Sequence, residues 1–93
     1  MKLIIDPAAM EWFRKEMDVK KGDAVRFFVR LGGCSTVQSG FSLGIAKEQP
    51  KEIGVSTVEG GITFYIEKED AWYLNNSDLV VTYNKERDEI EFR

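Results

Sequence analysis

The chain has 93 residues, which is long enough for one domain and short for two. It contains no histidine and a single cysteine, which excludes Ser-His-Asp and Cys-His catalysis, histidine metal ligation and an intrachain disulfide. The net charge is −3 and no basic run exceeds two residues, so nucleic acid is not expected as a partner. No apolar run reaches the length of a signal peptide or a membrane span, so we expect a cytoplasmic protein without a membrane partner.

The N-terminal segment predicts a strand followed by a helix. Residues 2–5 form a short apolar run. Asp6 followed by Pro7 is typical of a helix start, because the Asp side chain accepts from free N–H groups and proline fits the first helical position. The helix is expected over residues 8–17, with Trp12 or Phe13 anchoring it over a sheet. Its inner face is expected to carry Ala9, Trp12, Phe13 and Glu16, flanked by Met10 and Met17.

Alternating residues predict a strand over 25–31 with one fully apolar face, ending at Leu31. Its other face carries Arg26 and Arg30. Residues 59–93 hold nine acidic and four basic residues, so these arginines are expected to face solvent or to pair with that acidic half. An anion site on the two arginines is the alternative.

The remainder predicts further short strands and one short helix. Glu67, Glu69 and Asp70 are expected to start and cap the helix rather than to bind a hard cation. The glycine pair Gly60-Gly61 is a strong hairpin signal. The strands are expected at 41–45, 53–59, 62–66, 79–83 and 89–92, and the helix at 68–74, closed by Asn75-Asn76.

These elements predict an α+β, β-rich fold in a single domain over residues 1–93. The strands follow one another in sequence, which favours mostly antiparallel pairing. The expected architecture is a small sandwich or flattened barrel with one packed N-terminal helix and one short helix. The expected core residues are Phe27, Val29, Phe41, Leu43, Phe64, Ile66 and Val81.

The candidate site lies in residues 31–46, a stretch without charge that contains four glycines and the cysteine. Paired glycines after a strand allow positive φ angles and close approach of another group. Nearby backbone N–H groups, with Arg26 or Arg30, would favour the thiolate form that binds metals. A buried, inert cysteine in a structural turn is the alternative. The candidate residues are Gly32, Gly33, Cys34, Ser35 and Thr36.

The sequence resembles the HesB-like family, the A-type carriers of iron–sulfur cluster assembly, over nearly its whole length. The central Gly-Gly-Cys-Ser-Thr segment resembles the family's Gly-Gly-Cys-Ser-Gly motif, with Thr36 in place of its last glycine. The resemblance implies a HesB-like domain. Further matching pieces, in the family's order, are residues 4–9, 25–30, 39–43, 61–67 and 72–74.

The resemblance also implies one metal ligand, Cys34. Family carriers use three cysteines, one in the central motif and two in a C-terminal Cys-x-Cys tail, and only Cys34 matches. The chain therefore resembles a short, cysteine-poor branch with weak or lost cluster binding. A symmetric homodimer could bring two Cys34 thiolates together around iron or an iron–sulfur cluster, so a monomer and a homodimer both stay open.

The resulting hypothesis is a non-enzymatic accessory protein of iron–sulfur cluster biogenesis or iron handling. Its expected partner is the iron–sulfur assembly machinery or a client protein. The first alternative is a metal-free protein-interaction module that keeps the fold and docks through the uncharged loop. The second is a thiol or redox protein using Cys34, which lacks a histidine to activate the thiol and a second cysteine to resolve an oxidised one.

Overall fold

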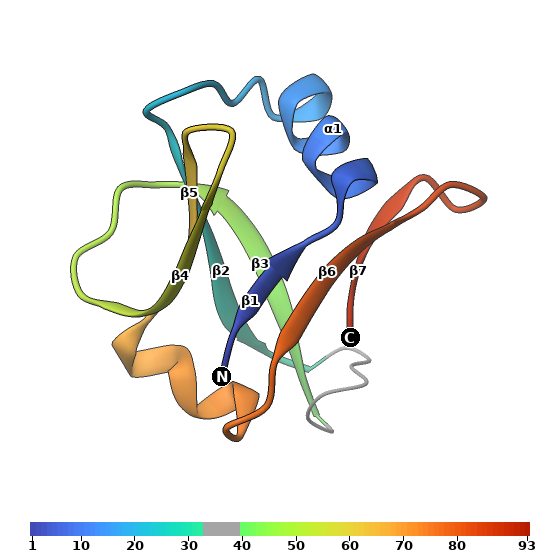
Figure 1. The fold of residues 1–93 in the computed structure, drawn as a ribbon. Helices are drawn as coiled ribbons and strands as arrows, with labels where there is room; N and C mark the ends of the chain where they lie inside the picture. The colour runs from blue at the N-terminus through green and yellow to red at the C-terminus, as the bar shows by residue number, and fades with distance from the viewer. Residues whose placement is uncertain (33–39) are drawn as a thin grey trace.

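A computed structural model describes residues 1–32 and 40–93, so Gly33, Cys34, Ser35 and Thr36 lie outside the described residues. The described residues form one α-helix, one 3-10 helix and seven strands, and the strands are arranged in two sheets (Figure 1). The elements are β1 (Leu3–Ile5), α1 (Pro7–Glu16), β2 (Ala24–Leu31), β3 (Phe41–Lys47), β4 (Ile53–Glu59), β5 (Ile62–Glu67), η1 (Lys68–Leu74), β6 (Leu79–Asn84) and β7 (Glu89–Phe92).

The larger sheet has the order β3-β2-β5-β4 and the smaller sheet the order β1-β6-β7. Neighbouring strands are antiparallel except in the pairs β1–β6 and β2–β5, which are parallel. The predicted β-rich α+β fold with mostly antiparallel pairing is confirmed. The expected architecture is a small sandwich or a flattened barrel. The strands of the described residues form two separate open sheets, which excludes the barrel.

Local sequence chemistry explains the element boundaries. Asp6 caps α1, since its Oδ1 accepts from the N–H of Ala8 at 2.9 Å, and Pro7 occupies the first turn. Gly60 and Gly61 have φ angles of 58° and 78°, which suit the two-residue type I′ turn between β4 and β5. These features fix the entry of α1 and the register of β4 with β5.

Three phenylalanine rings form the centre of the core. The rings of Phe13, Phe27 and Phe64 lie 5.1–6.1 Å apart, and all three residues are fully buried. Helix α1 is therefore anchored by Phe13, while Trp12 is only partly buried. Of the expected core, Phe27, Phe64, Ile66 and Val81 are buried, and Val29, Phe41 and Leu43 pack against it while partly exposed.

The predicted inner face of the helix is wrong at one position. Glu16 is exposed, and the buried residues of α1 are Ala9, Met10 and Phe13. Glu16 lies in the last turn of the helix. Trp12 and Met17 are partly buried and pack against the core beside the three buried residues.

Candidate functional site

Strands β2 and β3 are joined directly beside the candidate loop. The N–H of Gly32 donates to the carbonyl oxygen of Gly40 at 2.8 Å. Their φ angles are 86° and 83°, in the left-handed region that favours glycine. Gly32 and Gly40, the residues on either side of the candidate segment, therefore lie side by side. Cys34 lies outside the described residues, so its role as a metal ligand stays a prediction.

An apolar surface lies next to these glycines. We define the Trp72 surface as Leu31, Phe41 and Trp72. Leu31 and Phe41 face each other across the β2–β3 ladder, and the Phe41 ring meets the Trp72 ring edge-on at 5.3 Å. Leu31 is 88% exposed and Trp72 is 52% exposed. Adjoining exposed apolar side chains of this size are typical of interaction sites.

Leu31 lies at the exposed end of the apolar face that the sequence predicted for this strand. This face begins in the core, where Val25 and Phe27 are fully buried. Exposure then rises along the strand through Val29 to Leu31, because the β2–β3 hairpin extends past the core. Alternation in the sequence indicates which face of a strand a side chain is on, but it does not indicate how far along the strand the core extends.

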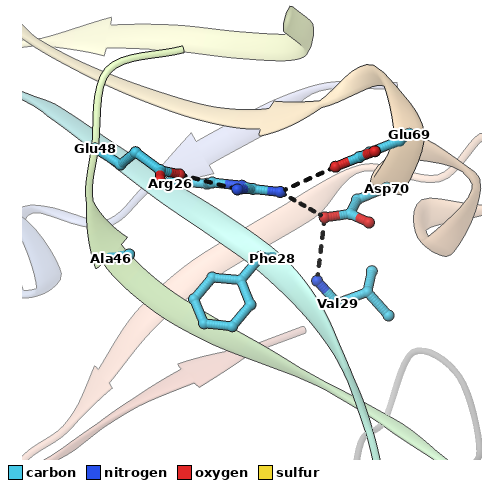
Figure 2. A pocket seen from close by; sticks show the side chains of 7 residues that line it. All are labelled: Arg26, Phe28, Val29, Ala46, Glu48, Glu69 and Asp70. Atoms are coloured by element: carbon cyan, nitrogen blue, oxygen red, sulfur yellow. Dashed lines mark hydrogen bonds and ion pairs between the residues drawn. The ribbon is translucent and has the colours of Figure 1, made fainter. Parts of the chain in front are cut away.

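A charged network lies on the other face of β2. Figure 2 shows the Arg26 guanidinium between Glu48 on one side and Glu69 and Asp70 on the other. The distances from its nitrogens are 2.9 Å to Glu48, 3.4 Å to Glu69 and 3.5 Å to Asp70. The hydrogen bond to Glu48 raises the pKa of Arg26 above its ordinary value, so Arg26 remains charged. The prediction that Arg26 pairs with the acidic half over residues 59–93 is confirmed for Glu69 and Asp70, whereas its shortest contact, with Glu48, lies outside that half. Arg30 is exposed, as expected.

Asp70 also ties η1 to the edge of β2, because the N–H of Val29 donates to its Oδ2 at 3.4 Å. The open pocket around this network has a volume of about 420 Å³. Its lining residues are Arg26, Phe28, Val29, Ala46, Glu48, Glu69 and Asp70 (Figure 2). The network therefore fixes the position of η1, the element that carries Trp72.

Glu67 has a different role from the helix cap that the sequence predicted. Its side chain makes no cap hydrogen bond to η1. Its two carboxylate oxygens instead accept from the N–H groups of Lys51 and Glu52, at 2.8 and 2.9 Å. These bonds hold the pKa of Glu67 below its ordinary value of 4.5. Glu67 thus fastens the β3–β4 connection, which also carries Glu48.

Replacing Glu67 with glutamine is expected to destabilise the fold at neutral pH, because the amide offers one acceptor to two N–H donors. The lowered pKa makes the contribution of Glu67 complete above pH 4.5 and progressively lost as the pH falls through the lowered folded value. The difference in melting temperature between wild type and Glu67→Gln should therefore shrink on acidification. The exposed Glu86→Gln is the control; a difference that is constant with pH would contradict this role for Glu67.

The acidic residues before and in η1 do not form a metal site. Glu67 binds backbone groups, while Glu69 and Asp70 contact Arg26. Over residues 1–32 and 40–93, no group of three or more His, Cys, Asp or Glu side chains could hold a metal ion. The hard-cation alternative therefore has no support in the geometry of these side chains.

Sequence reasoning missed Leu31 and Trp72 as candidate functional residues. The uncharged stretch from residue 31 to 46 was the one available signal, since it marked the neighbourhood as a docking candidate. Trp72 gave no separate signal, because an aromatic residue in a short helix is more often part of a core.

The chain matches known proteins over its full length. The family model described as iron-sulphur cluster biosynthesis covers residues 1–93. A Bacillus subtilis (strain 168) protein named pyruvate dehydrogenase inhibitor is 52% identical over 92 residues, covering 99% of this chain and 97% of that protein. An uncharacterised Staphylococcus saprophyticus protein is 33% identical over 95 residues, covering 99% of this chain and 97% of that protein.

None of the helices formed by the described residues is long and apolar enough to cross a membrane. The order of strands, helices and the glycine-flanked segment agrees with the resemblance seen in the sequence, and the match spans every residue. The chain belongs to the iron-sulphur cluster biosynthesis family, the HesB-like proteins.

Proposed function

We propose that this protein is a non-enzymatic, protein-binding inhibitor whose target is pyruvate dehydrogenase. The observation that carries the proposal is the 52% identity, over 99% of the chain, to the Bacillus subtilis protein that bears this name. The proposal adopts the metal-free interaction module rather than the accessory role in iron–sulfur cluster biogenesis.

The described surface supports protein binding. Leu31 and Trp72 are exposed apolar side chains beside the partly buried Phe41. Together the three side chains form an apolar patch that a partner protein could cover. Aromatic residues at such positions often dominate binding energy. A pocket for a small substrate is less well supported, because the described pocket around Arg26 is open and its charged groups already pair with one another.

Family membership favours a second candidate, an iron-handling protein that binds metal through Cys34. The donor set of one chain does not fit an iron–sulfur cluster, which needs three or four soft ligands, because the chain offers one cysteine and no histidine. The second candidate therefore requires a homodimer or ligands from another protein.

An inhibition assay tests the proposal. Purified pyruvate dehydrogenase complex from the organism that encodes this chain is titrated with the protein, and the rate of pyruvate-dependent NAD⁺ reduction is measured. We expect a saturable decrease in rate, together with formation of a complex in size-exclusion chromatography. A full rate at saturating protein, with no complex formed, would reject the proposed function.

Removing metal or the thiol separates the two candidates. We expect Cys34→Ser, and wild type treated with a chelator, to inhibit pyruvate dehydrogenase as wild type does, because the proposed contact uses apolar groups rather than a metal. Anaerobic reconstitution with iron and sulfide, followed by absorption spectroscopy, should give substoichiometric binding. Loss of inhibition in both the variant and the chelated protein would favour the iron-handling candidate instead.

A further inference from the structure

The exposed face of η1 joins an acidic side chain to the Trp72 surface. In a 3-10 helix, residues three apart lie directly above one another, about 6 Å apart along the axis. Glu69 and Trp72 have this spacing in η1. The Glu69 side chain is 77% exposed and Trp72 is 52% exposed. The helix therefore presents a carboxylate beside an aromatic ring on one accessible face.

The carboxylates around Arg26 leave an excess of negative charge next to this face. Three of them, from Glu48, Glu69 and Asp70, share the single guanidinium. The contact of Glu69 is long, at 3.4 Å, and Glu48 makes the short one, at 2.9 Å. Glu69 can accordingly accept a second cation from outside, and the local charge favours a basic group over an acidic one.

We infer that Glu69 and the Trp72 surface together form the docking surface for the target, and that the target presents an apolar side chain next to a lysine or arginine. The inference rests on the proposed function, since pyruvate dehydrogenase is the proposed target. On binding, Leu31, Phe41 and Trp72 would be covered at the centre of the interface. Glu69 would pair with the basic side chain at its rim.

Two substitutions at Leu31 test the apolar contact and the sign of the partner's charge at once. Leu31 is 88% exposed, so neither change should disturb folding. Affinity for purified pyruvate dehydrogenase complex is measured by biolayer interferometry. Both Leu31→Asp and Leu31→Lys remove apolar contact, but only the lysine repels a basic segment. We expect Leu31→Lys to weaken binding by about tenfold or more, and Leu31→Asp to weaken it less.

Substitutions in η1 test the same surface from its other side. Trp72→Ala should weaken binding by about tenfold or more, provided circular dichroism shows the wild-type fold. Glu69→Lys should weaken binding more than Glu69→Gln, and rising salt should weaken wild-type binding.

Val58→Lys and Val58→Asp are matched controls for the Leu31 variants. Val58 is a 62% exposed apolar residue two positions before the β4–β5 turn, and its substitutions should change nothing. This turn and η1 lie at opposite ends of β4 (Figure 1).

The possible outcomes distinguish a failure of the proposed docking surface from a failure of the proposed function. If wild type neither binds nor inhibits the complex, the proposed function fails. If wild type binds and the Leu31, Glu69 and Trp72 variants keep its affinity, the docking surface is wrong. If Leu31→Asp is as harmful as Leu31→Lys and salt has no effect, the surface binds the target but the basic segment is wrong.

Discussion

Truncation of Phe64 to alanine is expected to lower the free energy of unfolding by about 3–5 kcal/mol. Phe64 is fully buried in the middle of β5 and touches the rings of Phe13 and Phe27, with centroids 5.1 and 6.1 Å away. The change removes the ring that links α1 to the larger sheet and leaves a cavity between two layers that cannot close without moving the helix. Urea denaturation followed by tryptophan fluorescence measures the loss.

The neighbouring Thr63 provides the control, because its side chain lies on the opposite face of the same strand and is partly exposed. Thr63→Ala should cost far less than Phe64→Ala. A loss below about 1 kcal/mol for Phe64→Ala would show that the ring is not part of a tightly packed centre, since large-to-small core changes cost more than this.

Replacing Gly54 with valine is expected to destabilise the protein by about 1–3 kcal/mol through overpacking. Helix η1 crosses β4 at this glycine, where the β4–β5 register is irregular. A β-carbon at Gly54 would lie 2.9 Å from both the Cα of Lys68 and the Cβ of Ala71. The backbone of η1 must therefore move away, and with it the tryptophan of the proposed docking surface.

Gly54→Val should thus reduce both the denaturation midpoint and the affinity for pyruvate dehydrogenase. Ser56→Val serves as its counterpart, because Ser56 is exposed in the same strand and β-branched residues suit strands. Unchanged stability in Gly54→Val would mean that η1 does not rest on β4 in solution.

Features set by short-range chemistry could be predicted from the sequence. Strand β4 and its turn at Gly60-Gly61 match the prediction to the residue, because a two-residue glycine turn fixes the register of its flanking strands locally. The start of α1 at Asp6-Pro7 follows from capping in the same way.

Two features that depend on distant segments could not be predicted. The carboxylate of Glu67 finds its donors at Lys51 and Glu52, which only the tertiary fold brings to it. The exposure of Leu31 depends on how far α1 and the smaller sheet reach beneath β2, which no local pattern encodes. The sequence pattern of the strand consequently does not distinguish the apolar part of the candidate site from residues of the core.

The smaller sheet places residues from opposite ends of the sequence side by side. Leu3 of β1 pairs with Leu79 of β6 in parallel, and the N–H of Lys2 donates to Asp78 at 2.8 Å. Pairings this far apart in sequence slow folding, because the whole intervening chain must first be brought into place. During translation β1 emerges first and has no strand to pair with until residues 79–81 have been synthesised. A nascent chain therefore carries the residues of β1 without their partner strand until residues 79–81 are available, and interactions that shield these residues on the ribosome should raise the yield of native protein.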